Sequence, residues 1–360
     1  MGKKKLKLEC NIVVPPCETI KELMEEKGLS QMDIAVRSGL TNAAISKLVN
    51  NQATITNEIA VSLERVLGLP ASFWTKREAD YRQTLIKDAK TSELKQDLSW
   101  LDLVPVRELQ SRGSIAKTTD KVLLALDVLD FFGVSDSRTF KNAWLDCAVQ
   151  FRGAEQALKK PGYVATWLRL GEKECETRTA KPYDKESFLD ALQEIRGLTR
   201  EEPSLAIPEA ISLCASAGVV VCIVKQIAGA SISGATRWVS TSRAMIQLSY
   251  KYKQDDHFWF TFFHEAGHVL RHGRKLIFLE DSIFRSDKEE EREANDFAAN
   301  MLIPKQYASQ LPYLRSKAKI KQFALAIGIS PGIVVGRLQH DGLLDPSFCN
   351  NLKKKVDLEM

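Results

Sequence analysis

A histidine pair and a glutamate occur at a spacing that suits zinc chemistry. His264, Glu265 and His268 form the pattern His-Glu-x-x-His. Side chains four residues apart lie on one face of a helix, so both imidazoles can bind a single zinc ion. Glu265 lies on the adjoining edge, where it can accept a proton from water that the metal activates. The pattern therefore predicts His264 and His268 as zinc ligands and Glu265 as a general base.

The residues around this pattern predict one buried helix, from Asp256 to His272. Asp255 or Asp256 can cap its start, and Gly273 can take the left-handed position after its end. Buried histidines and glutamates need polar partners, which favours a metal over the alternative of two surface histidines on an amphipathic helix. His272 continues the same row and can act as a fourth ligand, but a cation near the helix end is the preferred interpretation. Aromatic side chains crowd the helix before the pattern: Phe258, Trp259, Phe260, Phe262 and Phe263.

A second, acidic helix supplies the candidate for a third zinc ligand, since a catalytic zinc ion usually has three protein ligands. Glu291 is the glutamate in phase with its small and apolar face, which includes Ala294 and Ala298. These small residues would let the helix approach the histidine helix closely. Asn295, one turn beyond Glu291, can orient a ligand by hydrogen bonding. Glu293 is the weaker candidate, and the alternative is an acidic helix start exposed to solvent.

Together the two motifs resemble the ImmA/IrrE family of metallopeptidases. The His-Glu-x-x-His helix is followed, after an acidic spacer, by Glu-x-Glu-Ala-Asn-x-Phe-Ala-Ala, which begins at Glu291. The resemblance covers roughly residues 205–344. It implies a small zincin domain that hydrolyses a peptide bond, typically in a transcriptional repressor. It also implies His264, His268 and Glu291 as zinc ligands and Glu265 as the general base.

Composition and charge limit the classes of protein to which this chain can belong. A length of 360 residues suggests two or three domains, and 44% hydrophobic and 27% charged residues are ordinary for a globular protein. The net charge of +5 is compatible with nucleic acid as a partner. None of the seven cysteines forms a Cys-x-x-Cys pair, which indicates reduced thiols. Because the sequence has no apolar run of membrane-spanning length and no signal-peptide core, we expect a cytoplasmic protein with no membrane partner.

Residues 18–73 have the rhythm of four short helices. Glycines at 28, 39 and 68 mark helix ends, and Ser30, Thr41 or Asn42, and Thr56 or Asn57 can cap helix starts. A tight Ser-Gly-Leu-Thr turn joins the second and third helices, as in a helix-turn-helix. The third helix presents short polar side chains suited to base edges and phosphates. The predicted DNA-contacting residues are Gln31, Thr41, Asn42, Ala43, Ser46 and Lys47.

This region resembles the lambda-repressor-like (XRE) helix-turn-helix from Gly28 to Leu48, and its continuation through Trp74 and Tyr81 is similar to HigA-type antitoxin repressors. The resemblance covers about residues 18–85. It implies binding to a DNA operator, usually as a homodimer, and autoregulation. One departure is that Lys47 is the single cation on the recognition face. A helix-turn-helix used only for protein contacts is therefore the alternative.

The rest of the chain predicts helices, then a short run of strands. Amphipathic helices are expected at 121–132, 139–151, 162–175, 183–197 and 204–216. The period then changes, and strands are expected at 219–224, 235–240 and 244–252, arranged as a small meander. Two closing helices follow Pro304, and few apolar residues remain after residue 350, so we expect a disordered tail.

These observations predict a mainly α fold with a small antiparallel β-sheet (α+β). We expect a lambda-repressor-like helix-turn-helix domain at 1–85 and a helical middle region at 86–203. A zincin-like domain at 204–345 and a tail at 346–360 complete the expected organisation. The middle region carries no catalytic constellation, and a spacer that packs on the zincin domain is preferred over a separate sensor or dimerisation domain.

The combined motifs predict a DNA-binding regulator fused to a zinc-dependent endopeptidase. Its partners would be a DNA operator and a protein substrate, either a repressor or an antitoxin, or else a toxin. The alternative is a HigA-like antitoxin or repressor whose zincin domain senses or scaffolds without cleaving. Glu265 favours the enzyme, because a binding module has no need of a general base. Tyr307 and Arg337 are candidates for stabilising charge only through their proximity in sequence.

Overall fold

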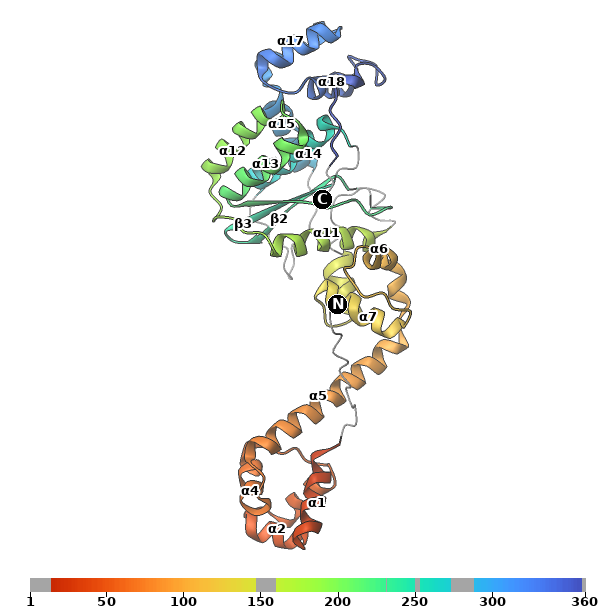
Figure 1. The fold of residues 1–360 in the computed structure, drawn as a ribbon, viewed down its shortest axis with the longest axis vertical. Helices are drawn as coiled ribbons and strands as arrows, with labels where there is room; N and C mark the ends of the chain where they lie inside the picture. Colours follow the sequence, from red (N-terminus) through yellow and green to blue (C-terminus); the bar gives the residue numbers. More distant parts are fainter. Residues whose placement is uncertain (1–13, 147–159, 231, 250–252, 273–287, 358–360) are drawn as a thin grey trace, which may run out of the picture. The chain divides into compact units, whose positions relative to one another are not determined.

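The chain divides into two units, Met1–Asp97 and Leu98–Met360, which are described separately. The computed structural model describes residues 14–146, 160–230, 232–249, 253–272 and 288–357 (Figure 1). α5 runs through residue 85, where the sequence placed its first domain boundary. The helices of the first unit are α1 (Pro16–Lys27), α2 (Gln31–Ser38), α3 (Asn42–Val49), α4 (Asn57–Leu67) and α5 (Ala71–Gln96).

Helix caps set the boundaries of this first unit, as the sequence predicts. The Ser30 hydroxyl accepts from the backbone of Asp33, whose carboxylate accepts in turn from the backbone N–H of Ser30. Thr41 and Thr56 cap α3 and α4 by accepting from backbone N–H groups one turn on. Each cap satisfies a donor that the helix itself leaves open. Left-handed glycines end three of these helices, at Gly28, Gly39 and Gly68.

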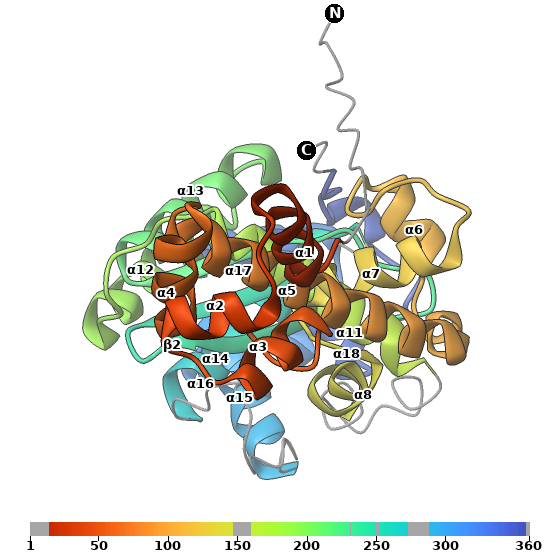
Figure 2. The ribbon, with the colours of Figure 1, turned by 90° about the horizontal axis from the view of Figure 1, so that it is seen from below.

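The four short helices gather around the first turns of α5, as Figures 1 and 2 both show. Ile34 of α2, Ile45 of α3 and Trp74 of α5 are fully buried in one shared core. The side chain of Asn51, just after α3, donates a 2.6 Å hydrogen bond to the hydroxyl of Tyr81 on α5. The helix-turn-helix is therefore held by apolar packing and by a polar tie at the end of α3.

Three strands form one sheet in the described part of the second unit: β1 (Val219–Ile223), β2 (Gly234–Ser240) and β3 (Arg243–Leu248). Their order is β1-β3-β2, with β1 parallel and β2 antiparallel to β3. The sheet is mixed, so the prediction of an antiparallel meander is wrong. The unbroken apolar run of β1, buried at every residue, is typical of a parallel strand covered on both faces and is the signal that was missed.

Helices cover both faces of this sheet (Figure 1). Alternate strand residues point to opposite layers: Val220, Cys222 and Met245 pack with Cys175 of α11 (Pro161–Glu176), whereas Val219, Val221 and Ile246 join the main core. That main core also takes in α12 (Lys185–Leu198), α13 (Pro203–Ser216) and α14 (Asp255–Arg271).

Polar contacts fasten α11 to the sheet as well. The indole N–H of Trp167 donates to the carbonyl of Val224 at 3.1 Å, and Arg237 on β2 donates to the carbonyl of Leu168 at 2.8 Å. Arg237 is buried and also pairs with Glu172. This part of the predicted middle region therefore packs on the sheet, whereas its residues 86–97 belong to the first unit.

The other predicted helices of this unit are also present where the chain is described. Residues 137–145 are helical, and the remainder of the predicted helix 139–151 lies outside the described residues from 147 on. The segments not yet named are η1 (Ser99–Leu103), α6 (Val106–Ser111), α7 (Lys121–Phe132), α8 (Ser137–Phe140), η2 (Lys141–Leu145), α15 (Lys288–Leu302), α16 (Lys305–Ala308), η3 (Leu311–Tyr313), α17 (Lys317–Ile327), α18 (Pro331–His340) and η4 (Asn350–Leu352).

The helices of the described residues are short or carry polar residues. No single helix there is both long and apolar enough to cross a bilayer. α17 and α18 reach membrane-spanning length and apolar composition only as a pair, and the pair is bent by 113° at the break between them. Their buried residues, among them Phe323 and Val334, belong to the main core.

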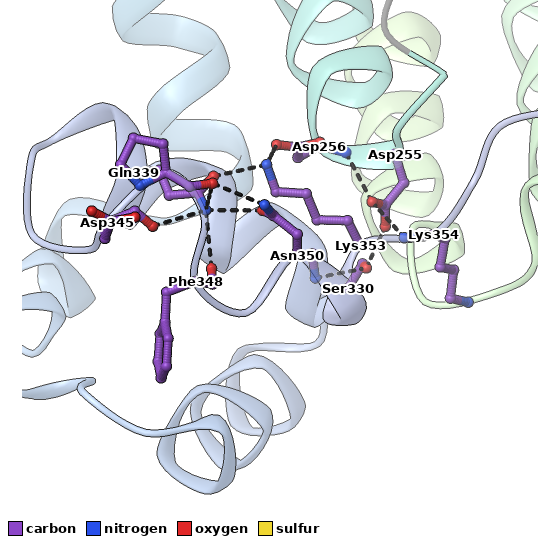
Figure 3. Close-up of polar contacts among 11 residues, drawn as sticks. Asp255, Asp256, Ser330, Gln339, Asp345, Phe348, Asn350, Lys353 and Lys354 are labelled. Atoms are coloured by element: carbon purple, nitrogen blue, oxygen red, sulfur yellow. Dashed lines mark hydrogen bonds and ion pairs between the residues drawn. The ribbon is translucent and has the colours of Figure 1, made fainter.

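Residues 345–357 run back along the domain and join the start of α14 (Figure 3). The prediction of a disordered tail after residue 350 is therefore wrong as far as residue 357. Lys355 pairs with Gln254 as an isolated antiparallel bridge. The backbone N–H of Asp255 donates to the carbonyl of Lys354 at 3.0 Å, and the N–H of Lys354 donates to the Asp255 carboxylate at 2.9 Å. We call residues 345–357 the C-terminal strap.

Buried charges seal the strap against α14. Lys353 and Asp256 form a 2.7 Å ion pair with side chains only 5% and 6% exposed. Ser330 donates to the second oxygen of Asp255 at 2.6 Å, and burial raises the pKa of that carboxyl group. Gln254 is the residue before the helix, without a side-chain cap, so the predicted capping role of the two aspartates is wrong. Their carboxylates bind the strap instead.

Breaking the buried ion pair tests the strap. We expect Lys353→Met to lower the free energy of unfolding of the second unit by about 3–5 kcal/mol, because it leaves the Asp256 carboxylate buried without its partner. The measurement is urea unfolding, monitored by hydrogen exchange on peptides from α14. As a control, Lys355→Met removes an exposed pair with Asp357 and should change the value by less than about 1 kcal/mol. Equal losses in the two variants would contradict a special role for the strap.

Candidate metal centre

Two helices, α14 and α15, carry the chemistry-bearing residues, and small side chains let them meet closely. A Cβ placed on Gly267 would lie 3.2 Å from the Cα of Ala294 and 3.1 Å from the ring of Phe297. Ala294 and Ala298 are fully buried at this contact. The prediction that these alanines permit a close approach is confirmed. Because the helices lie this near, a side chain on α15 can reach the histidines of α14.

The structure brings His264, His268 and Glu291 into one cluster, with a potential donor atom of each within 4.8 Å of the others. The Nε2 atoms of the two histidines are 3.1 Å apart. Glu291 reaches both, with carboxylate oxygens 3.5 Å from His264 Nε2 and 3.4 Å from His268 Nε2. We call these three residues the donor cluster.

The contacts and spacing of the two histidines fit a metal ion at the donor cluster. His264 Nδ1 lies 3.0 Å from the side-chain oxygen of Asn295, which only accepts, so Nδ1 carries the proton and Nε2 presents a lone pair. Two tetrahedral Zn–N bonds of about 2.0–2.1 Å place their nitrogens roughly 3.3 Å apart. The observed separation of 3.1 Å agrees with this value. The contact to Asn295 is the one that its spacing from Glu291 predicts.

His272 lies one turn beyond His268, and the structure departs from its predicted role as a cation near the helix end. Its Nδ1 is 2.8 Å from Nδ1 of His268, and its Nε2 is 3.3 Å from a carboxylate oxygen of Glu293. Burial, followed by the proximity of His268, lowers the pKa of His272. The imidazole is therefore neutral at pH 7. Glu293 contacts His272 and is not one of the three donors, as expected of the weaker ligand candidate.

Glu265 is 1% exposed and sits against β2 rather than in the donor cluster. The hydroxyl of Thr236 lies 2.8 Å from the Glu265 carboxylate and 3.0 Å from its backbone carbonyl. A Cβ on Gly234 would come within 2.6 Å of that carboxylate, so a larger residue there would displace the Glu265 side chain. No pattern in the sequence singles out Thr236, because only the pairing of β2 in the sheet brings it beside α14.

The two residues suggested as charge-stabilising groups, Tyr307 and Arg337, have other partners. Arg337 on α18 donates to Asp341 at 2.7 Å, and the ring of Tyr307 on α16 packs against Phe323. The described contacts therefore do not support either residue as a charge-stabilising group of the donor cluster.

The first unit offers a separate polar surface on α3. Ala43 and Lys47 are exposed on α3, and Thr41 is exposed at its start. Ser46 is half-buried and accepts a 3.4 Å hydrogen bond from Asn50. Ile45, Leu48 and Val49 point into the core. Asn42 is exposed beside Thr41, and Gln31 is half-buried at the start of α2, so the predicted DNA-contacting residues are available on the surface.

Comparison with protein families matches both units. Residues 214–339 match the family model of the IrrE N-terminal-like peptidase domain, and residues 20–74 match a helix-turn-helix model. The chain joins a helix-turn-helix domain to an IrrE N-terminal-like domain. The whole donor cluster and Glu265 fall inside the IrrE-like match, whereas α11 and α12 precede it. No curated protein and no solved structure gives a significant match.

Metal content is the first test of the donor cluster. We expect the purified protein to hold about one zinc ion per chain, and His264→Ala and Glu291→Ala to lose most of it, because each removes one of three protein ligands. Elemental analysis after dialysis against buffered zinc makes the measurement. Glu289→Gln, an exposed change on the same helix, should keep its zinc. Wild-type protein that stays metal-free under these conditions would rule out a zinc site.

Proposed function

We propose that this DNA-binding regulator carries a zinc-dependent endopeptidase that cleaves a repressor- or antitoxin-type protein in the cytoplasm. The supporting observation is the donor cluster of His264, His268 and Glu291, with the buried carboxylate of Glu265 on the same helix held by Thr236. The two family matches support a DNA-binding regulator with a peptidase-family domain. The substrate class and the proteolysis are our proposal.

In this proposal each residue of the site has a separate role. The donor cluster holds the zinc ion, which when bound supplies a Lewis acid for the scissile carbonyl and for the attacking water. Glu265 accepts the proton of that water and returns it to the leaving amine. Thr236 donates to the Glu265 carboxylate and so fixes its direction within the site. Asn295 holds His264 with its Nε2 lone pair toward the donor cluster.

The substrate would bind as an extended segment. β2 pairs with β3 on one side, and no described strand pairs with its other side. Through Gly234 and Thr236, β2 also lies directly against Glu265. A strand edge beside the general base can align a peptide by main-chain hydrogen bonds, which requires no particular side chain. The chemistry therefore suits an exposed, unstructured stretch of another protein.

The helix-turn-helix would place the regulator on an operator, as a homodimer. Thr41, Asn42 and Ala43 lie at the start of α3, the part of a recognition helix that enters the major groove. Gln31 at the start of α2 and Lys47 on α3 would contact phosphates, while Ser46 faces base edges. With a single cation on this face, affinity depends more on base contacts than on charge.

Two substitutions separate these DNA roles. We expect Lys47→Ala to weaken binding to all sequences alike and to reduce the salt slope by about one unit, because it removes one phosphate contact. Asn42→Ala should instead relax the preference at one base position by about 1–3 kcal/mol. Binding-site selection from a random pool, followed by titration at several salt concentrations, measures both. Lys76→Ala, an exposed lysine on α5, is the control. Wild-type affinity in both α3 variants would exclude α3 as the recognition helix.

Proteolysis is tested by the general base. We expect new protein N-termini in cells that express the wild type, and their loss with Glu265→Gln, because the amide cannot accept the proton. Mass spectrometry of protein N-termini makes the comparison, and Glu289→Gln serves as the matched control. Zinc content and DNA binding should be unchanged in Glu265→Gln. If the wild type yields no new N-termini, the domain is a sensor or scaffold, as in a HigA-like antitoxin, and capture of a toxin becomes the next experiment.

A further inference from the structure

The two histidines of the donor cluster have different outer partners. His264 meets a neutral amide, that of Asn295, at 3.0 Å. His268 meets a third imidazole, His272, at 2.8 Å, and His272 in turn meets the carboxylate of Glu293 at 3.3 Å. We call His272 and Glu293 the outer pair. One histidine is thus linked to a neutral group and the other, through the outer pair, to a negative charge.

When a metal is bound, the hydrogen bonds that link His268, His272 and Glu293 can run in only one direction. Nε2 of His268 faces the other two donors of the cluster and must present its lone pair to the ion. Its proton is therefore on Nδ1, which donates to Nδ1 of His272. His272 then carries its own proton on Nε2, which donates to Glu293. Each ring is left with a single allowed tautomer.

Resting on the proposed zinc site, we propose that the outer pair acts as a positioning unit that strengthens zinc binding by His268. A carboxylate that accepts from a histidine relay draws the proton of the ligand imidazole outward and raises the basicity of the nitrogen that binds the metal. The relay also fixes the ring plane of His268. Neither His272 nor Glu293 needs to touch the ion.

Glu291 and Glu293 of α15 differ in how they reach the metal site, the first directly and the second through His272. Glu291 contacts both Nε2 atoms of the donor cluster, while Glu293, two residues on, turns toward His272. The side chain of His272 is 10% exposed, which shields the relay from water. Glu293 is 44% exposed, so its charge alone, acting through solvent, is largely screened. Its effect on the metal must therefore pass through the imidazole of His272.

Zinc affinity of the full chain tests this proposal. The dissociation constant is measured by competition with a chromophoric chelator for the wild type, His272→Phe, Glu293→Ala and the double variant. We expect each single variant to bind zinc 10- to 100-fold more weakly. The double variant should be no weaker than the weaker single variant, because either change already breaks the relay. Glu293→Gln, which keeps an oxygen acceptor, should recover part of the loss, and Glu289→Ala should stay within twofold of the wild type.

The double variant distinguishes a relay through His272 from a direct effect of the Glu293 charge. Losses that multiply in the double variant would show that Glu293 acts on the ion by charge alone, and would overturn the proposal. Single variants within twofold of the wild type would overturn it as well. A wild type that binds no zinc would defeat the proposed function itself, and with it this inference. Hydrogen exchange of the metal-free variants should match that of the metal-free wild type, because the relay acts on the metal and not on the fold.

Discussion

The candidate site depends on one steric constraint, the absence of a side chain at Gly267. This gap lets α15 lie against α14 with Ala294 at the contact, and so brings Glu291 within reach of both histidines. A methyl group there would meet backbone as well as the ring of Phe297, so the helices would have to separate. A three-donor cluster built from two helices tolerates little such movement, because metal–ligand distances vary by only a few tenths of an ångström.

α14 is held from three directions, and each contact has a different chemical character. The sheet contributes apolar packing and the hydroxyl of Thr236, and α15 contributes a close approach of small residues. The C-terminal strap contributes a buried ion pair between Lys353 and Asp256. Burying ions costs more than their attraction returns unless the geometry is good, so the strap favours one position of the helix start over others. A site that needs three aligned side chains benefits from that specificity.

Local patterns predicted much of this structure. Caps such as Ser30 and Thr41 marked the starts of helices, and the phase of Glu291 against the alanines placed it opposite the histidines. What failed was non-local. No spacing rule links Thr236 to Glu265, and the parallel pairing of β1 with β3 follows only once both sheet faces are seen to be covered. The contact between His272 and Glu293 could not be predicted from spacing, because the two residues lie on different helices.

The contact between the C-terminal strap and α14 has a consequence for the order of folding during synthesis. The hydrogen bond from Lys354 to Asp255 joins residues 99 positions apart. The helix that carries both histidines therefore cannot complete the contacts of its two aspartates until almost the whole described chain has left the ribosome. The helix-turn-helix unit has no such dependence and can fold first, as N-terminal domains generally do. A nascent or truncated chain would thus acquire its DNA-binding unit before its metal centre.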